Sequence, residues 1–521
     1  MPYTLPYCLL ISRMDLYLYG RLASRIPSRR TLHAQSFPTL SVCSQNERHR
    51  RSRESCFENN FLRQKHQHRK AHTRRNITST AYDTAESASQ PSDMRPPRPL
   101  ACIPLDSLVR SYIITSISSV PFLLRPSLAA MTFLAHTKSR LFNPDRNPIL
   151  HSLLKHTFYA QFCAGETPSE VQRTITNLKN TGFKGVILGH AKEVVLSKEE
   201  ADGLNEPKNA AVQAQVDAEE IATWRQNTID TVDLAQQGDF VALKFTGAGR
   251  QALRHLKATI ACSPEFEEAV HDICKRAQQK GVKLLFDAEQ ASLQQGIDNW
   301  TMYFAKRYNR EHALVYGTYQ AYAKRTPQNL ASHLELARRE GFVLGVKLVR
   351  GAYMGSDPRE LFWATIDETH KCYNGIARSI LQQRYQGILQ PVEGGSTEFP
   401  RVALVLATHN AESVRLASEL RDEQARTGAP RIELAYGQLM GMADNVSYEV
   451  VQRARTRLAS HDSNGSVEVP RAYKYLVWGK MGECMKYLLR RAHENRDAMT
   501  RTVEARRALG RELGIRMAFW R

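Results

Sequence analysis

The stretch Val346–Tyr353 reads VKLVRGAY and overlaps an apolar run, 342–349, whose valines and leucines predict a β-strand. Lys347 lies inside this strand, Arg350 follows it directly, and Tyr353 lies just beyond. A buried cation is costly unless an anion meets it. Taken singly, the strand is explained by cations that reach solvent or a neighbouring carboxylate. Several other strands also end in charge-bearing groups, and this repetition favours a binding or catalytic site.

The same short apolar strand recurs along the chain, separated each time by a helical stretch. Eight strands are predicted, at 183–189, 240–245, 283–287, 313–317, 342–349, 401–407, 432–436 and 474–479. Thr167-Pro168 and Ser263-Pro264 open helices between them, and Gly281 ends one. Continuously apolar strands of this kind are typical of parallel sheets buried on both faces. Eight such units over about 330 residues predict an α/β fold of the (β/α)8 barrel type.

Length and composition fit one large domain with extensions on either side. The 521 residues include nine scattered cysteines without any C-x-x-C pair, which argues for a reducing compartment and against a disulfide framework. The net charge is +20, and about half of that excess lies in residues 1–100, with 17 Lys and Arg against 7 Asp and Glu. The remaining charge suits an anionic ligand, an acidic membrane surface or a nucleic acid.

The N-terminal part differs from the barrel in composition. The first hundred residues are rich in Arg, Ser and His and poor in acids, as in a mitochondrial transit peptide, although an untargeted disordered tail has the same composition. The apolar segment Ser111–Thr137 is interrupted by Pro121 and Pro126, so a membrane-spanning helix is not expected, whereas packing on the main domain or shallow bilayer contact is. The predicted regions are 1–100, a transit peptide and disordered basic extension; 101–165, a helical apolar arm; 166–505, the barrel; and 506–521, a C-terminal tail.

In a barrel of this type the reactive groups lie at the carboxyl ends of the strands. The polar residues found at those ends are Lys244, Asp287, Glu289, Gln320, Lys347, Arg350, Tyr353, Thr408, His409 and Asn410. Each one alone is explained by a structural role, but five consecutive polar strand ends favour a shared site.

The last predicted helix carries a second polar pattern. Tyr487, Arg490, Arg491 and Glu494 fall on one helical stripe, and Tyr475 precedes them on the final strand. A solvent-exposed face with an ion pair explains the stripe equally well. Adjacent arginines with a nearby lysine, however, are suited to holding a small carboxylate or a phosphate.

One motif in the chain is misleading. Gly247-Ala248-Gly249 with Ala252 imitates a dinucleotide-binding fingerprint between a strand and a helix. The acidic residue expected about twenty positions later is absent, since Asp287 lies forty residues on. A Rossmann-type nucleotide site is therefore not predicted.

Four motifs together identify a family. DAEQ (287–290), KLVRGAYM (347–354), ATHN (407–410) and YLLRRAHEN (487–495) occur in this order. With them the chain, over about 145–500, resembles the proline dehydrogenases, and closely the fungal mitochondrial members. The resemblance implies a (β/α)8 barrel with non-covalent FAD and oxidation of L-proline to 1-pyrroline-5-carboxylate, the first step of proline catabolism. It further implies hydride transfer to flavin N5, ubiquinone as electron acceptor, peripheral contact with the matrix side of the mitochondrial inner membrane, and no nucleic-acid partner.

The resemblance also assigns roles to single residues. Asp287 and Lys347 match the two essential positions near the flavin, with Lys347 beside N5. The carboxylate clamp is implied to be Lys244, Arg490 and Arg491; the wall around the substrate ring, Tyr353, Tyr475 and Tyr487; and the flavin contacts, Gln320, Lys347, Ala352, Thr408 and His409. Glu494 is implied to hold the arginine helix, Glu289 to support the cations, and no metal is expected. A tyrosine at the position of Tyr475 goes with proline, whereas a smaller residue goes with hydroxyproline.

Two other function classes remain open on the residues alone. A Schiff-base lyase on the same barrel would use Lys244 or Lys347 as its amine nucleophile. Nucleic-acid binding rests on net charge alone, because aromatic and basic residues are not interleaved.

Overall fold

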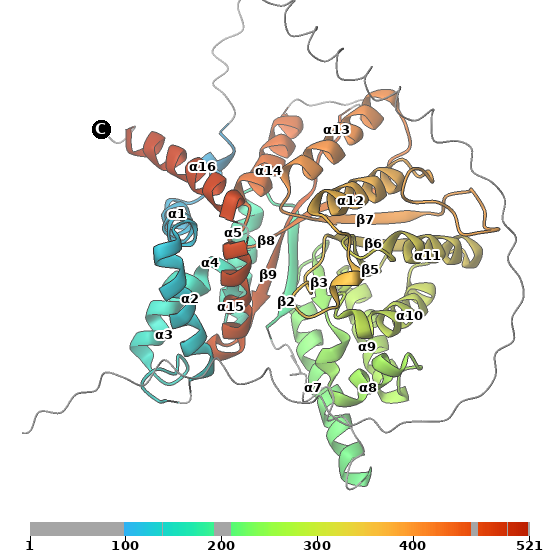
Figure 1. The fold of residues 1–521 in the computed structure, drawn as a ribbon, viewed down its shortest axis with the longest axis horizontal. Coiled ribbons are helices and arrows are strands. Elements are labelled where there is room, and N and C mark those ends of the chain that lie inside the picture. Colours follow the sequence, from blue (N-terminus) through green and yellow to red (C-terminus); the bar gives the residue numbers. More distant parts are fainter. Residues whose placement is uncertain (1–97, 138, 192–209, 460–466, 498, 519–521) are drawn as a thin grey trace, which may run out of the picture. The chain divides into compact units, whose positions relative to one another are not determined.

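The computed structural model describes residues 98–137, 139–191, 210–459, 467–497 and 499–518 (Figure 1). All of them belong to one compact unit, Asp93–Arg521. Residues 1–97 of the predicted transit peptide and basic extension (1–100) lie outside these residues. The last three are described: Arg98 pairs with Glu512, and Pro99 and Leu100 begin a 3-10 turn.

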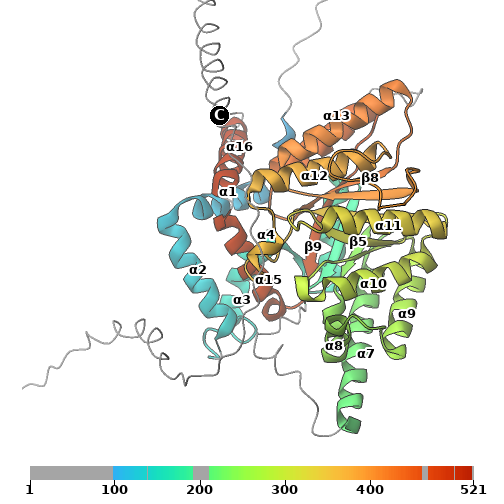
Figure 2. The ribbon, with the colours of Figure 1, turned by 45° about the vertical axis from the view of Figure 1, so that its right-hand side comes forward.

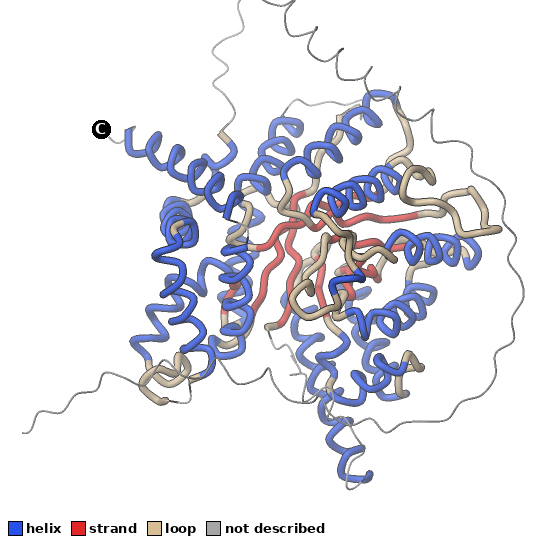
Figure 3. The backbone as a smooth tube through the Cα atoms, viewed as in Figure 1, coloured by secondary structure: helices blue, strands red, loops and turns tan. Residues whose placement is uncertain are grey.

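Eight parallel strands close into a barrel, which confirms the predicted (β/α)8 fold. The strands are β2 (Gly185–His190), β3 (Phe240–Leu243), β4 (Lys283–Phe286), β5 (Val315–Gln320), β6 (Leu344–Val349), β7 (Val402–Ala407), β8 (Glu433–Leu439) and β9 (Ala472–Trp478). Each pairs with the next, and β9 closes the circle on β2. Figure 3 shows the strands in red, ringed by helices. A ninth strand, β1 (Cys163–Gly165), was not predicted; it pairs with the end of β9 beyond the reach of β8.

Helices lie before, between and after the strands of the barrel. They are α5 (Pro168–Asn180), α7 (Ala210–Leu234), α8 (Arg250–Ala258), α9 (Pro264–Lys280), α10 (Ala291–Tyr308), α11 (Thr326–Glu340), α12 (Ile366–Leu381), α13 (Ala411–Thr427), α14 (Asp444–Ala459), α15 (Met481–Asp497) and α16 (Met499–Ala518), with 3-10 turns at Pro99–Cys102, Phe245–Ala248 and Arg359–Leu361. Two predicted helix boundaries are confirmed, because Ser263 accepts the Phe266 N–H and Gly281 ends α9 in the left-handed conformation.

The short helix α8 was not predicted, and it explains why the glycine-rich motif is not a nucleotide site. The Glu220 carboxylate accepts the Arg250 N–H at 2.8 Å, so an anion of the protein already lies at the start of α8. A Cβ at Gly249, whose φ is +100°, would also collide with Glu220. No space is left there for a phosphate.

The barrel interior is apolar at one end and polar at the other. At the amino end the ring of Phe240 lies 5.6 Å from that of Tyr316 and 5.1 Å from that of Tyr473. These rings fill the lumen with buried aromatic surface. The carboxyl end is lined by the charged groups described below, as the strand-end pattern predicts.

The apolar arm consists of α1 (Leu105–Ser119), α2 (Pro121–His136), α3 (Pro148–Leu154), a π-helical turn (Lys155–Tyr159) and α4 (Ala160–Phe162). Figures 1 and 2 both show α2 beside α15, and α1 packs against α16. A buried polar link fixes the arm to the barrel, since the Ser111 hydroxyl contacts Gln161 and Asp444 and Asp444 pairs with Lys474. No single described helix has the length and apolarity needed to cross a membrane; α1 and α2 meet that criterion only together, across a 102° bend.

Candidate active site

The centre of the barrel mouth is a buried ion pair. Lys347 extends inward from β6, and its Nζ lies 2.5 Å from Oδ1 of Asp287, the residue that follows β4. Their side chains are only 8% and 13% exposed. From the opposite side of the lumen, the Tyr475 hydroxyl donates to the other Asp287 oxygen at 3.4 Å, and the Lys347 ammonium lies 5.4 Å from the Tyr475 ring centroid. Strands β4, β6 and β9 thus meet at one carboxylate.

Space for Tyr475 depends on a glycine of the neighbouring strand. A Cβ at Gly189 of β2 would come within 3.1 Å of the Tyr475 hydroxyl. A Cβ at this position would be in tight contact with the hydroxyl, so Tyr475 would have to shift by a few tenths of an ångström.

The loop after β4 is held by its own hydrogen bonds. Glu289 is buried, and its carboxylate accepts the backbone N–H and the hydroxyl of Thr246. Burial raises the pKa of Glu289, and the nearby Lys244 ammonium opposes part of that rise. Glu289 therefore acts on Lys244 through charge and on Thr246 through hydrogen bonds. Lys244 itself is half-buried at the end of β3.

Gln320 joins the loop after β4 to the loop after β6. Its amide donates to the Glu289 carbonyl at 3.2 Å and accepts the Ala352 N–H at 3.3 Å. The backbone turns at Gly351, just before Ala352. Only glycine fits there, because its φ is +142° and a Cβ would overlap the Tyr322 ring. Tyr353 lies half-buried on the loop that follows.

Arg350 has a role that no motif assigned to it. Its guanidinium donates to the Thr408 hydroxyl at 2.7 Å, to the Ser413 hydroxyl at 2.8 Å and to His370 Nδ1 at 3.1 Å. It also stacks 4.4 Å from the ring centroid of Tyr373. This one side chain ties the end of β6 to the end of β7. The sequence signal was a second cation directly after the strand, which did not reveal its partners.

Thr408 and His409 connect β7 to β8. His409 Nε2 accepts the Leu439 N–H at 3.1 Å, so this nitrogen carries no proton. The amide of buried Gln438 donates to the Thr408 carbonyl at 3.2 Å. The strand ends thereby form a continuous hydrogen-bonded rim from β3 to β8.

Helix α15, which carries Arg490 and Arg491, packs toward the barrel mouth through Tyr487. Tyr487 is buried, and the Arg491 guanidinium lies 4.9 Å from its ring centroid. Tyr475 packs against the same apolar cluster as Tyr487, so the two tyrosines join α15 to the ion pair. Arg490, on the same helix, is half-buried. The Glu494 side chain lies outside the described residues.

Comparison with known proteins identifies the family. A family model described as proline dehydrogenase matches residues 171–504. The chain belongs to the proline dehydrogenase family. It is an enzyme of that class, as the four motifs of the sequence indicate.

Named relatives point the same way. The chain is 29% identical to the "Probable proline dehydrogenase, mitochondrial" of Schizosaccharomyces pombe over 77% of its own length and 86% of that protein. It is 27% identical to the hydroxyproline dehydrogenase of Bos taurus, covering 70% and 82%. The crystal structure of proline utilization A from Bdellovibrio bacteriovorus has a similar fold, with a TM-score of 0.50 and 16% identity over 71% of this chain and 37% of that one.

Proposed function

We propose that this protein oxidises L-proline to 1-pyrroline-5-carboxylate at the barrel mouth, with FAD as cofactor and ubiquinone as the final electron acceptor. The observation that carries the proposal is the buried Asp287–Lys347 pair with Tyr475 above it. The proposed reaction removes a hydride from C5 of proline and a proton from its nitrogen, which leaves a C=N bond.

The donors at the mouth fit a flavin. Among the described residues the Lys347 ammonium makes one hydrogen bond, to Asp287, so two of its three N–H groups remain for a ligand. The flavin ring is planar and rich in hydrogen-bond acceptors, so it suits a buried ammonium group. Gln320, Thr408 and His409 lie on the adjoining rim of strand ends. FAD, when bound, supplies the hydride acceptor at N5. Lys347 supplies positive charge there, and Asp287 fixes the position of that charge.

The substrate side is proposed to use the cations of α15. Arg490 and Arg491, with Lys244, hold the carboxylate of proline, because a planar guanidinium forms paired hydrogen bonds with a carboxylate. Tyr475 and Tyr487 form the apolar wall that excludes water from the ring. The buried position of Arg491 and its stacking on Tyr487 support this arrangement.

The cellular setting is proposed from the relatives and the presequence. Several relatives are named mitochondrial proline dehydrogenases, and residues 1–100 have the composition of a transit peptide. We therefore place the protein on the matrix side of the inner membrane, in peripheral contact with the bilayer that carries ubiquinone.

The visible absorption spectrum of the purified full chain tests this function. We expect a yellow protein with flavin bands that bleach when L-proline is added without oxygen. A folded, colourless protein that does not take up added FAD would exclude the proposal. A lyase that uses Lys347 is disfavoured by its ion pair, since a protonated ammonium is not a nucleophile; trapping of a carbonyl substrate by borohydride would reverse that conclusion.

Hydroxyproline is a second candidate substrate, because one relative is named hydroxyproline dehydrogenase. Tyr475 favours proline, because in the family that the chain resembles a tyrosine at this position goes with proline and a smaller residue with hydroxyproline. Bleaching rates with the two substrates decide between them, and faster bleaching by hydroxyproline would overturn this preference.

A further inference from the structure

Helix α1 presents its apolar side chains outward. Leu105, Val109 and Ile113 form one stripe at four-residue spacing, and all three are exposed. The opposite face, which packs on the protein, consists of Leu108 and Ile114 with the serines Ser111 and Ser118, all buried. Helix α1 therefore carries apolar side chains on its exposed face as well as on its buried one, whereas the exposed face of a helix in water is mostly polar.

Helix α2 carries apolar side chains on both faces. Leu124, Leu128 and Met131 are buried, and the first two pack with Ala492 of α15. The exposed face carries Phe122, with 85% of its surface exposed, and Phe133, with 51%. Arg125, Thr132 and His136 are exposed on the same face, which is therefore mixed, whereas the exposed face of a helix in water is mostly polar.

The apolar surface continues beyond α2. Leu141 and Phe142 are exposed in the loop that follows, and the Phe142 ring lies 5.4 Å from that of Phe133. Ile149 and Leu153 add one exposed stripe of α3, at 82% and 60% exposure. Ten of the 21 large apolar side chains exposed among the described residues fall between positions 105 and 153. Such a concentration marks an interaction surface.

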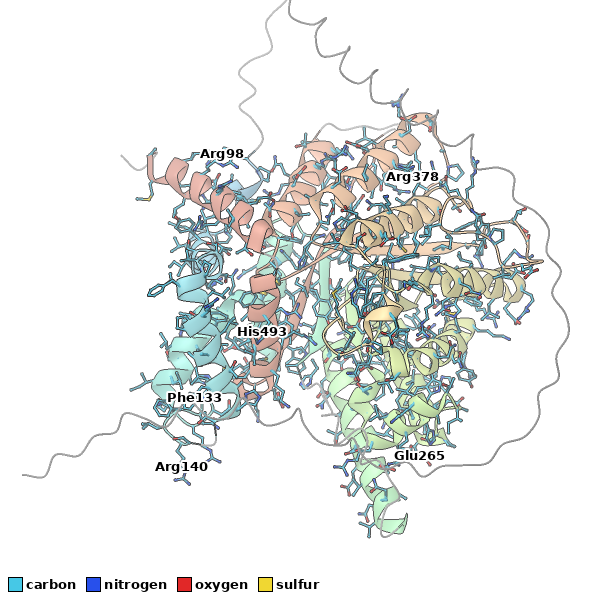
Figure 4. All side chains as sticks on the ribbon, in the orientation of Figure 1. Arg98, Phe133, Arg140, Glu265, Arg378 and His493 are labelled. Atoms are coloured by element: carbon cyan, nitrogen blue, oxygen red, sulfur yellow. The ribbon has the colours of Figure 1, made fainter. Side chains whose placement is uncertain are left out.

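The charges around this surface are basic. Arg125 is exposed on α2, and Arg140 and Arg146 are exposed in the loop between α2 and α3. The acidic residues near them are Asp145 in that loop and the exposed Asp106 of α1. Asp145 is occupied, since its carboxylate accepts the Gly482 N–H at 2.9 Å. Figure 4 shows Phe133 and Arg140 at the same end of the arm. Aromatic and aliphatic side chains flanked by arginines are typical of the interface between a bilayer and water.

We propose that the exposed faces of α1, α2 and α3 dock on a bilayer containing anionic phospholipid. The helices would lie in the interface, because the 16 residues of α2 reach about 24 Å whereas a hydrocarbon core is about 30 Å thick. A second copy of the chain fits less well, since a two-fold contact would bring the same three arginines together from both copies. This assignment rests on the peripheral membrane contact proposed above and gives that contact its surface.

Co-sedimentation of the purified full chain with vesicles tests the proposal, independently of FAD and proline. The vesicles are phosphatidylcholine alone or phosphatidylcholine mixed with cardiolipin. The double variant Phe122→Ser/Phe133→Ser should reduce binding to the mixed vesicles by about tenfold or more, because each ring loses its apolar burial. Arg125→Gln/Arg140→Gln should reduce binding to the mixed vesicles and leave weak binding to neutral ones unchanged.

The matched control is Ile366→Ser/Leu458→Ser, which removes two similarly exposed apolar side chains from α12 and α14 and should leave vesicle binding unchanged. Unchanged binding by the phenylalanine variant, or an equal loss in the control, would overturn the proposal. So would a phenylalanine variant that binds vesicles normally but changes from dimer to monomer in light scattering, since a second copy would then cover the surface.

Discussion

Removing either charge of the barrel-mouth ion pair should destabilise the fold strongly. In Lys347→Met the Asp287 carboxylate keeps only the Tyr475 hydroxyl, 3.4 Å away, as a side-chain partner among the described residues. In Asp287→Asn the ammonium is left buried beside a neutral amide. Because both side chains are less than one-seventh exposed, each single change should cost about 3–5 kcal/mol, as for other broken buried pairs.

The double variant Asp287→Asn/Lys347→Met separates this mechanism from simple loss of contacts. It leaves no net charge in the lumen, so its free energy of unfolding should return to within about 1–2 kcal/mol of the parent. The assay is urea unfolding followed by circular dichroism, with the slope checked in every variant. As a control, Glu412→Gln/Arg415→Met removes an exposed pair on α13 and should change the unfolding midpoint little.

Additivity would refute this reasoning. If the double variant loses the sum of the two single losses, the two charges do not compensate one another. Single losses below about 1 kcal/mol would mean that water reaches the pair and screens it. The bleaching assay should still fail in all three variants, because Lys347 and Asp287 are proposed to act on the cofactor as well as on each other.

Three further predictions concern other parts of the chain. Arg350→Lys keeps the charge but cannot make three hydrogen bonds in one plane, so urea unfolding should show a loss of about 1–3 kcal/mol; an unchanged midpoint would contradict the rim described here. Burial raises the pKa of Asp298 to about 6, which favours the folded state as pH falls, and lowers that of His333 to about 4, which favours it as pH rises. The two contributions are about 3 kcal/mol each and oppose one another. In Asp298→Asn the free energy of unfolding should therefore fall more steeply than in the parent as the pH is lowered from 6.5 to 4. Parallel curves of unfolding free energy against pH for the two proteins would exclude the effect. Lys474→Met leaves Asp444 unpaired beside the arm and should cost about 3 kcal/mol, with earlier proteolysis of α1 than in the parent as the readout.

Much of the barrel was predictable because its signals are local. Apolar runs of β-branched residues, a proline after a serine, and a glycine after a helix act over a few residues, and they located all eight barrel strands. Strand β1 was not predicted, because its three residues make no apolar run and become a strand only by pairing with β9.

The sequence alone determined which groups lie at the carboxyl ends of the strands, since strand direction and polar residues are both written in it. Only the tertiary structure decided which of them touch. Tyr475 and Asp287 are 188 positions apart and meet because the barrel closes, and Arg350 reaches Thr408 because β6 and β7 are neighbours. The arm shows the same division: its apolar composition was evident, but the burial of its serines and the exposure of its phenylalanines follow from where α15 and α16 pack. Composition is a property of the chain, whereas burial depends on contacts between segments far apart in sequence.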